Sequence, residues 1–198
     1  MQVASPASLA AQAQAELVTQ PLYAARTVAS ADSSTNFFDG TSASDRRLTN
    51  VPTANVLNHP KFFRIGGFRL VPDIIVTGGA QSAPEAAAED FISLLYDGFF
   101  EFKIGDLKPY LTVPNFFIPG GLGPVFRGVD NRTAGAGQFA FTLTNGEAIH
   151  ANFLRIKHWI SIPPLQSFAA QITWSSLVLV ASTVLWSFLD GEYGREVL

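Results

Sequence analysis

The hydrophobic pattern is most informative between Trp159 and Leu189, a stretch without a single charged residue. Pro163 and Pro164 exclude a helix near its start, because proline lacks the backbone N–H and its ring clashes with the preceding turn. Ser167 to Trp174 then alternates between apolar and polar side chains, as in a strand with one buried face. The remaining apolar run is rich in β-branched and aromatic residues. The pattern therefore predicts strands in the last third of the chain.

Two longer elements are predicted in the middle of the chain. Phe62 to Val76 has the composition of a strand, and the Gly66-Gly67 pair within it indicates a bulge or bend. Ser82-Ala-Pro-Glu85 is a capping-box sequence with proline in the first turn, so a helix is expected from Ala83 to Tyr96. Asp97-Gly98 ends that helix.

Shorter alternating segments predict further strands, and Asn145-Gly146 predicts a hairpin turn between two of them. The loops are expected at 114–124, which is rich in Pro and Gly, and at 125–137. The shorter strands are expected at Phe99–Ile104, Lys108–Val113, Gln138–Thr144 and Glu147–Ile156, and Trp159–Ile162 is expected to lead into the penultimate strand. About eight strands with one inserted helix indicate an all-β, antiparallel sandwich or jelly roll.

The pattern divides the chain into three parts. Residues 1–60 are predicted to form an N-terminal arm and an extended loop, because few large apolar side chains are present and Ser, Thr, Asn and Asp are frequent. Phe37 and Phe38 are an apolar island there, a plug for the chain's own core or for a neighbour. Residues 61–190 are expected to form the compact domain, and residues 191–198 a polar tail.

Composition adds a large core and a weakly charged surface. The 198 residues include 17 Phe, and 47% are hydrophobic but only 15% charged, against about 25% charged in an average protein. The net charge is −3 and no block of Lys or Arg occurs in residues 1–60, so strong direct binding of nucleic acid is not expected. A C-terminal membrane helix is an alternative, although the most apolar piece is shorter than the roughly 20 residues that a span needs.

No pattern in the sequence indicates catalysis, a metal or a cofactor. His59, His150 and His158 lack a metal-ligand spacing, and there is no cysteine. The Gly120–Gly123 segment has no following Lys-Ser/Thr and no helix after it, so a turn is favoured over a phosphate loop. The three tryptophans, Trp159, Trp174 and Trp186, are core or interface residues or else a platform for sugars.

Three segments of the chain resemble the jelly-roll capsid proteins of tailless icosahedral viruses, phages in particular. Leu57 to Val71 is similar to the first strand entering such a barrel, and Phe99 to Pro119 to a strand pair with its long loop. Ile160 to Trp174 resembles the turn and penultimate strand, with Leu177 to Leu189 as the closing strand. The resemblance implies a single jelly-roll β-sandwich or barrel with one inserted helix and an extended N-terminal arm.

The function that this resemblance implies is structural: a subunit of an icosahedral capsid, located in the virion, that acts by self-assembly and not as an enzyme. Its partners would be copies of the chain, as trimer, pentamer or hexamer, and other capsid proteins, with an underlying membrane as a further partner to consider. We expect Phe37, Phe38, Phe116 and Phe117 to contact neighbouring subunits. A monomeric β-sandwich that binds carbohydrate and a membrane-anchored protein are the alternatives.

Overall fold

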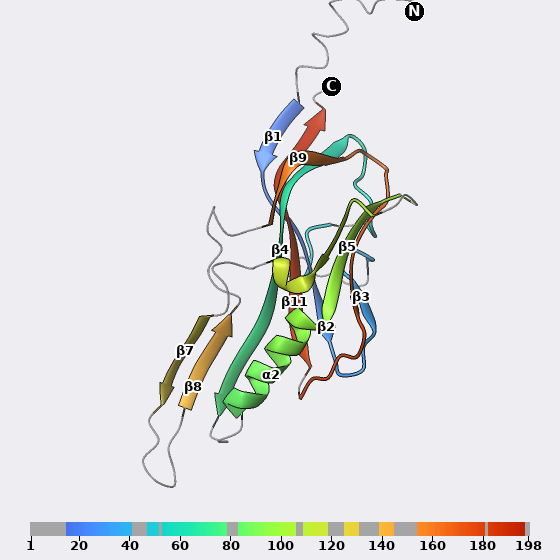
Figure 1. Cartoon of the computed structure of the whole chain (residues 1–198). Coiled ribbons are helices and arrows are strands. Elements are labelled where there is room, and N and C mark those ends of the chain that lie inside the picture. Colours follow the sequence, from blue (N-terminus) through green and yellow to red (C-terminus); the bar gives the residue numbers. More distant parts are fainter. Residues whose placement is uncertain are drawn as a thin grey trace, which may run out of the picture.

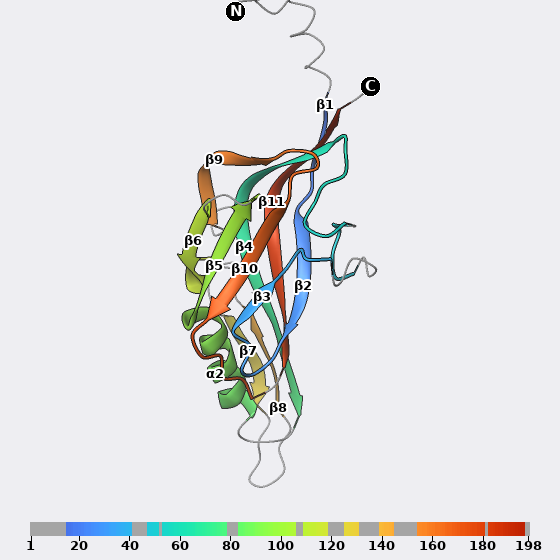
Figure 2. The same cartoon turned by 90° about the vertical axis from the view of Figure 1, so that its right-hand side faces the viewer.

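In the computed structural model, the chain folds into an antiparallel β-sandwich of two layers (Figure 1, Figure 2). The structure describes residues 15–40, 47–51, 53–78, 83–105, 109–118, 125–130, 139–144, 154–180 and 182–196. The strands in chain order are β1 (Ala15–Thr19), β2 (Leu22–Val28), β3 (Ser34–Asn36), β4 (Lys61–Gly78), β5 (Gly98–Ile104), β6 (Leu111–Pro114), β7 (Val125–Asp130), β8 (Phe139–Thr144), β9 (Leu154–Ile162), β10 (Phe168–Trp174) and β11 (Thr183–Glu196). A helix, α2 (Ala83–Tyr96), and a 3-10 turn, η1 (Asn115–Phe117), complete the described elements.

The first sheet is built on two long strands, β4 and β11, which run side by side. β11 pairs on its other edge with β1 and β2, and β4 pairs with β9 near its start and with β8 near its end. β7 then pairs with β8. The second sheet has the order β3-β10-β5-β6, and every pairing in both sheets is antiparallel.

The core lies between the two sheets and is dominated by phenylalanine. Phe68 of β4 contacts Phe100 and Phe102 of β5 across the sandwich, with ring centroids 5.6 and 5.3 Å apart. Strict alternation produces this packing, because every second residue of β5 and β10 is buried. Each buried Phe contributes roughly 1.5–3 kcal/mol of transfer free energy, so these rings account for much of the stability of the fold.

The helix α2 lies beside the second half of β4 and next to the start of β5, at the lower end of the sandwich in Figure 1. Phe91, Leu94 and Leu95 are buried, whereas Ile92 and Tyr96, one turn apart, are exposed. The expected bounds of this helix, Ala83 to Tyr96, are those of the structure.

The sandwich begins earlier and ends later than the sequence pattern predicts. β2 and β3 lie within residues 1–60, and they pair with β11 and β10, so the described part of that segment belongs to the domain and is not an arm. Residues 191–196, expected in a polar tail, continue β11 and pair with β1 and β4. Residues 125–130, expected in a loop, form β7.

The uncharged segment from Trp159 onward is built of strands, as its pattern predicts. Its described residues form the end of β9, all of β10 and the first half of β11, while the Leu177–Val180 run precedes β11 without strand pairing. Among the helices of the described residues, none combines the length and the apolar character needed to cross a membrane. The expected hairpin at Asn145-Gly146 lies outside the described residues.

Candidate interaction surface

An exposed aromatic cluster lies where α2, η1 and β5 meet. We call Tyr96, Phe116 and Phe117 the aromatic cluster. The rings of Tyr96 and Phe116 are stacked, with centroids 5.2 Å apart and an interplanar angle of 12°, and Phe117 packs on Phe116 at 4.8 Å. Tyr96 is 59% exposed, Phe117 55% and Phe116 44%. Exposed Ile92 lies one turn before Tyr96 on α2 and extends the apolar surface.

Buried anchors on both sides of the two phenylalanines hold them at the surface. Asn115 is completely buried and donates a hydrogen bond from Nδ2 to the backbone carbonyl of Leu94, at 3.0 Å. Ile118 is also completely buried, and its N–H donates to the carbonyl of Asn115 at 2.9 Å. Because the residues before and after Phe116-Phe117 point inward, the short 3-10 turn directs both rings outward.

The carbonyl of Leu94 is the point at which these elements are joined. It lies in the last turn of α2, where a backbone carbonyl has no partner within the helix. The indole Nε1 of Trp174 donates a second hydrogen bond to it, at 3.2 Å. One helix end is thus tied to η1 and to β10, so the aromatic cluster is carried on a rigid support.

The proline before η1 suits its position at the edge of the sheet. Pro114 ends β6, which is the last strand of the second sheet, and it lies opposite Phe99 of β5. Proline is tolerated on an edge strand because no neighbour requires its missing N–H. The change from strand to 3-10 turn therefore follows directly after it.

The other predicted contact pair, Phe37 and Phe38, lies in the chain's own core. Phe37 is 0% and Phe38 3% exposed, and Phe38 packs on Phe168 with centroids 5.3 Å apart. The sequence left open whether these two rings fill the chain's own core or insert into a neighbour. In the structure they fill the chain's own core. Their rings are therefore not available to a partner subunit in this conformation.

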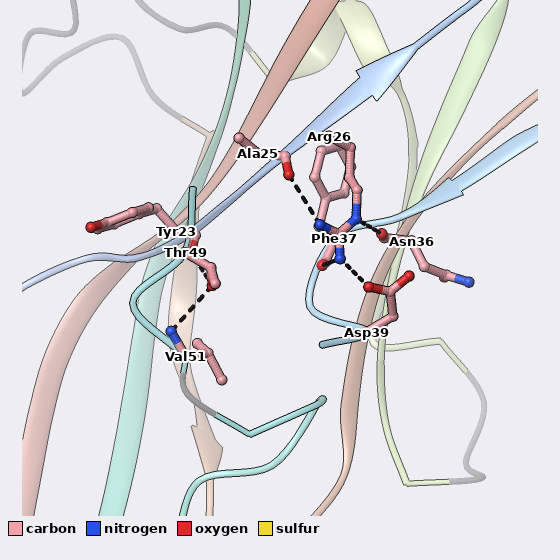
Figure 3. A network of polar contacts seen from close by, with 8 residues as sticks. All are labelled: Tyr23, Ala25, Arg26, Asn36, Phe37, Asp39, Thr49 and Val51. Atoms are coloured by element: carbon pink, nitrogen blue, oxygen red, sulfur yellow. Dashed lines mark hydrogen bonds and ion pairs between the residues drawn. The ribbon is translucent and has the colours of Figure 1, made fainter. Parts of the chain in front are cut away.

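Arg26 holds this core segment in place (Figure 3). Its Nε donates to the carbonyl of Asn36 at 2.9 Å, and its terminal nitrogens donate to the carbonyls of Ala25 and Phe37 at 3.2 and 3.3 Å. It also forms a salt bridge with Asp39. The planar guanidinium has five donors in a fixed geometry, so one side chain of β2 ties the first sheet to the end of β3 in the second.

The outer edge of β2 is covered by a loop. The N–H of Ala25 donates to the carbonyl of Leu48 at 2.7 Å. Thr49 Oγ1 donates to the carbonyl of Tyr23 at 2.9 Å (Figure 3). The side-chain oxygen of Asn50 accepts a hydrogen bond from the N–H of Tyr23. Covered edges do not add strands from other chains, so this part of β2 is protected from edge-to-edge pairing.

The three tryptophans have different environments. Trp174 is buried beneath α2. Trp186, on β11, stacks on Phe188 with centroids 6.2 Å apart, and the Arg69 guanidinium lies 4.5 Å from the centroid of Phe188. Trp159, on β9, is 54% exposed. The three rings therefore do not form one common platform.

Within the described residues, no group of three or more His, Asp or Glu side chains is positioned to hold a metal ion. His59 and His158 are exposed, and His150 lies outside the described residues. Comparisons with protein-family models, with curated proteins and with solved structures found no match.

Proposed function

We propose that this chain is a structural subunit of an icosahedral virus capsid, located in the virion and acting by self-association without catalysis. The observation that carries the proposal is the aromatic cluster, which is fixed at the surface by buried Asn115 and Ile118. Large aromatic side chains are enriched at the centres of protein interfaces, where they lose little conformational entropy on burial. A contact that is rigid before assembly needs little further ordering.

The strand order supports a jelly roll as the finer description of the sandwich. A jelly roll is a long antiparallel hairpin that is rolled up. In the hairpin the first strand pairs with the last and the second strand with the last but one, and this nesting continues to the central pair. Here β2 pairs with β11, β3 with β10, β4 with β8 and β9, and β5 with β6. Rolling places β11 beside β4 and β10 beside β5, and both pairings are present.

The weak surface charge supports association as well. Charged groups are costly to bury in an interface unless they are paired, and only 15% of the residues are charged. The cluster also has no charged member, and its nearest described neighbour along α2 on the exposed face is the apolar Ile92. Exposed Asp97 follows Tyr96 directly, so a second copy that covers the aromatic rings would have to leave this carboxylate at the hydrated rim of the contact.

The test replaces Phe116 and Phe117 by Ser together and measures the mass in solution by light scattering after size exclusion. We expect the unaltered chain to form discrete oligomers or shell-sized particles, and the double variant to remain a monomer with an unchanged far-UV circular dichroism spectrum. Tyr110→Ser is the matched control, because Tyr110 is also an exposed aromatic residue but precedes the opposite end of β6. It should assemble as the unaltered chain does.

Two outcomes would contradict the proposal. The unaltered chain could be monomeric at all concentrations, which would favour a monomeric binding module. Alternatively, the double variant could assemble as well as the control, which would place the contact elsewhere on the molecule.

A further inference from the structure

The outer face of the second sheet is polar and open to solvent. In Figure 2 this sheet, with the order β3-β10-β5-β6, lies in front of the first sheet. None of its pairings changes register, so alternate side chains of each strand point to the same face. The side chains on the inner face contribute to the core, whereas those on the outer face are exposed or half-buried.

Two rows of outward-facing side chains cross all four strands of this face. The first row consists of Asn36, Gln171, Glu101 and Thr112, in which each residue lies opposite the next in register. The second row lies beside it, two residues along each strand, and consists of Ser34, Thr173, Phe99 and Pro114. Neighbouring strands are about 4.8 Å apart, so each row is about 14 Å long.

The first row presents hydrogen-bond donors and acceptors to solvent. A side-chain amide both donates and accepts, and the amides of Asn36 and Gln171 form no hydrogen bond within the described part of the chain. Glu101 accepts a hydrogen bond from Thr112 Oγ1 at 3.5 Å. Its carboxylate has room for further hydrogen bonds, because each oxygen has two lone pairs. This row can therefore bind several hydroxyl groups at once.

The charges on this face balance each other. Lys103 lies two residues from Glu101 on β5, and its Nζ is 3.3 Å from the second carboxylate oxygen of Glu101. The other residues of β3, β5, β6 and β10 are uncharged. The face therefore matches a neutral ligand, because a charged ligand would be repelled by one member of the ion pair.

The second row adds an accessible aromatic ring. Phe99 is 40% exposed, and its neighbours in register are the small side chains of Thr173 and Pro114. The face of an aromatic ring carries partial negative charge. The C–H groups on the face of a pyranose ring are electropositive, so a sugar ring stacks on such a side chain with its hydroxyl groups directed sideways.

We infer that this face binds a neutral oligosaccharide, with one sugar ring stacked on Phe99 and its hydroxyl groups hydrogen-bonded to Gln171 and Glu101. The rest of the first row extends the site toward β3 and β6, so that an extended saccharide chain can follow it. All of these residues belong to one subunit. The site therefore adds a ligand to the structural role proposed above and does not depend on assembly.

A second copy of the chain is the competing occupant of this face, and the side-chain chemistry favours the saccharide. A protein surface that covered Asn36 and Gln171 would have to supply a partner for each amide group, because a polar group buried without a partner costs free energy. A sugar hydroxyl both donates and accepts, and water molecules can bridge the remaining groups at an open face.

The experiment titrates the full chain with three neutral, extended hexasaccharides, cellohexaose, chitohexaose and β-1,4-mannohexaose, followed by saturation-transfer difference NMR. At least one should bind with a dissociation constant of about 1 mM or below. The affinity is expected to be modest, because an open face covers one side of the ligand where a pocket would surround it. Binding should be the same at low and high NaCl concentration, since the ligand carries no charge.

Two substitutions test the named contacts. Phe99→Ala should weaken binding about three- to tenfold through the loss of ring stacking, and Phe99→Trp should retain it. Gln171→Ala should weaken binding to a similar extent through the loss of a hydrogen bond. Trp159→Ala is the matched control, because Trp159 is an exposed aromatic residue of the first sheet, and it should bind as the unaltered chain does. Circular dichroism checks that every variant is folded.

The inference is overturned if none of the three hexasaccharides binds at about 10 mM, or if Phe99→Ala and Gln171→Ala bind as well as Trp159→Ala. Replacing Phe116 and Phe117 by Ser separates this site from self-association: that variant should lose assembly and keep saccharide binding. If it loses both, the site is not formed by a single subunit. If Phe99→Ala impairs assembly and no hexasaccharide binds, the face is a subunit contact instead.

Discussion

At the scale of single residues, Ser187 is a polar side chain without a polar contact. It lies on β11 between buried Leu185 and Leu189, it is 0% exposed, and its Oγ has no hydrogen-bond partner among the described residues. A buried, unsatisfied hydroxyl costs about 1–3 kcal/mol. We expect Ser187→Ala to raise the free energy of unfolding by about 1 kcal/mol in urea titrations. Ser161→Ala, at an exposed position of β9, should change it by less than about 0.5 kcal/mol.

Arg26 gives a second prediction at this scale. Its side chain is only 12% exposed, and three backbone carbonyls and Asp39 accept hydrogen bonds from it. Arg26→Ala should lower the free energy of unfolding by about 1–3 kcal/mol, because two partly buried carbonyls lose a charged donor. Asp39 is 35% exposed, so Asp39→Asn should cost less than about 1 kcal/mol. Equal losses in the two variants would show that the ion pair, and not the carbonyl contacts, is what matters.

The two Phe-Phe pairs show what a sequence can and cannot provide for a candidate surface. Each pair follows an asparagine in a segment that the sequence pattern predicts to be a loop, so the sequence alone does not distinguish them as candidate contacts. The two pairs differ in their contacts with residues far away in the sequence. Arg26 donates a hydrogen bond to the carbonyl of Phe37, and the Phe37-Phe38 rings are buried. Asn115 donates to the carbonyl of Leu94, and the Phe116-Phe117 rings that follow it are exposed. Such anchors are formed by tertiary contacts, which have no local pattern.

At the scale of elements, regular alternation was the reliable guide. It predicts β5, β8 and β10 to within a few residues, while strand-like composition predicts β4 and a capping box predicts α2. It missed β2, in which Arg26 occupies an inward-facing position and breaks the apolar pattern. β3 has only three residues and is defined by its pairing with β10. The last six residues of β11 are polar or small, apart from Tyr193, because they extend beyond the main core and bury little.

The junction of elements beside the aromatic cluster gives the third prediction. A Cβ at Gly98 would lie 2.5 Å from Asn115 Nδ2 and 2.6 Å from Trp174 Cδ1, and both of those side chains donate to Leu94. Gly98→Ala should therefore cost about 1–3 kcal/mol through overpacking. It should also change the fluorescence of Trp174 and reduce self-association.

Gly66→Ala is the matched control for this substitution. A Cβ there meets the Trp159 ring at 3.5 Å, an ordinary van der Waals distance. Urea titrations should give a change below about 1 kcal/mol for this variant. A loss as large as that of Gly98→Ala would show that the cost comes from the strand backbone and not from the crowded junction.

At the scale of the whole molecule, the strands closest to the two ends of the chain are neighbours. β2 pairs with β11 from Leu22↔Leu189 onward, and β1 pairs with the end of β11. Contacts of such high sequence separation must be formed against the entropy of closing long loops. We expect refolding from urea in milliseconds to seconds, measured by stopped-flow tryptophan fluorescence. Complete refolding within microseconds would mean that the pairing of the end strands does not limit the rate.

The pairing of Ala15 with Glu196 also has a practical consequence. A short peptide joining these two positions would close the backbone into a ring, and new ends could be opened at the exposed turn around Leu165. Such a circular permutant would keep every strand neighbour while changing the order in which the strands are synthesised. Figure 1 shows the start of β1 and the end of β11 side by side at one end of the sandwich, so two cargoes fused directly to Ala15 and to Glu196 would be held next to each other.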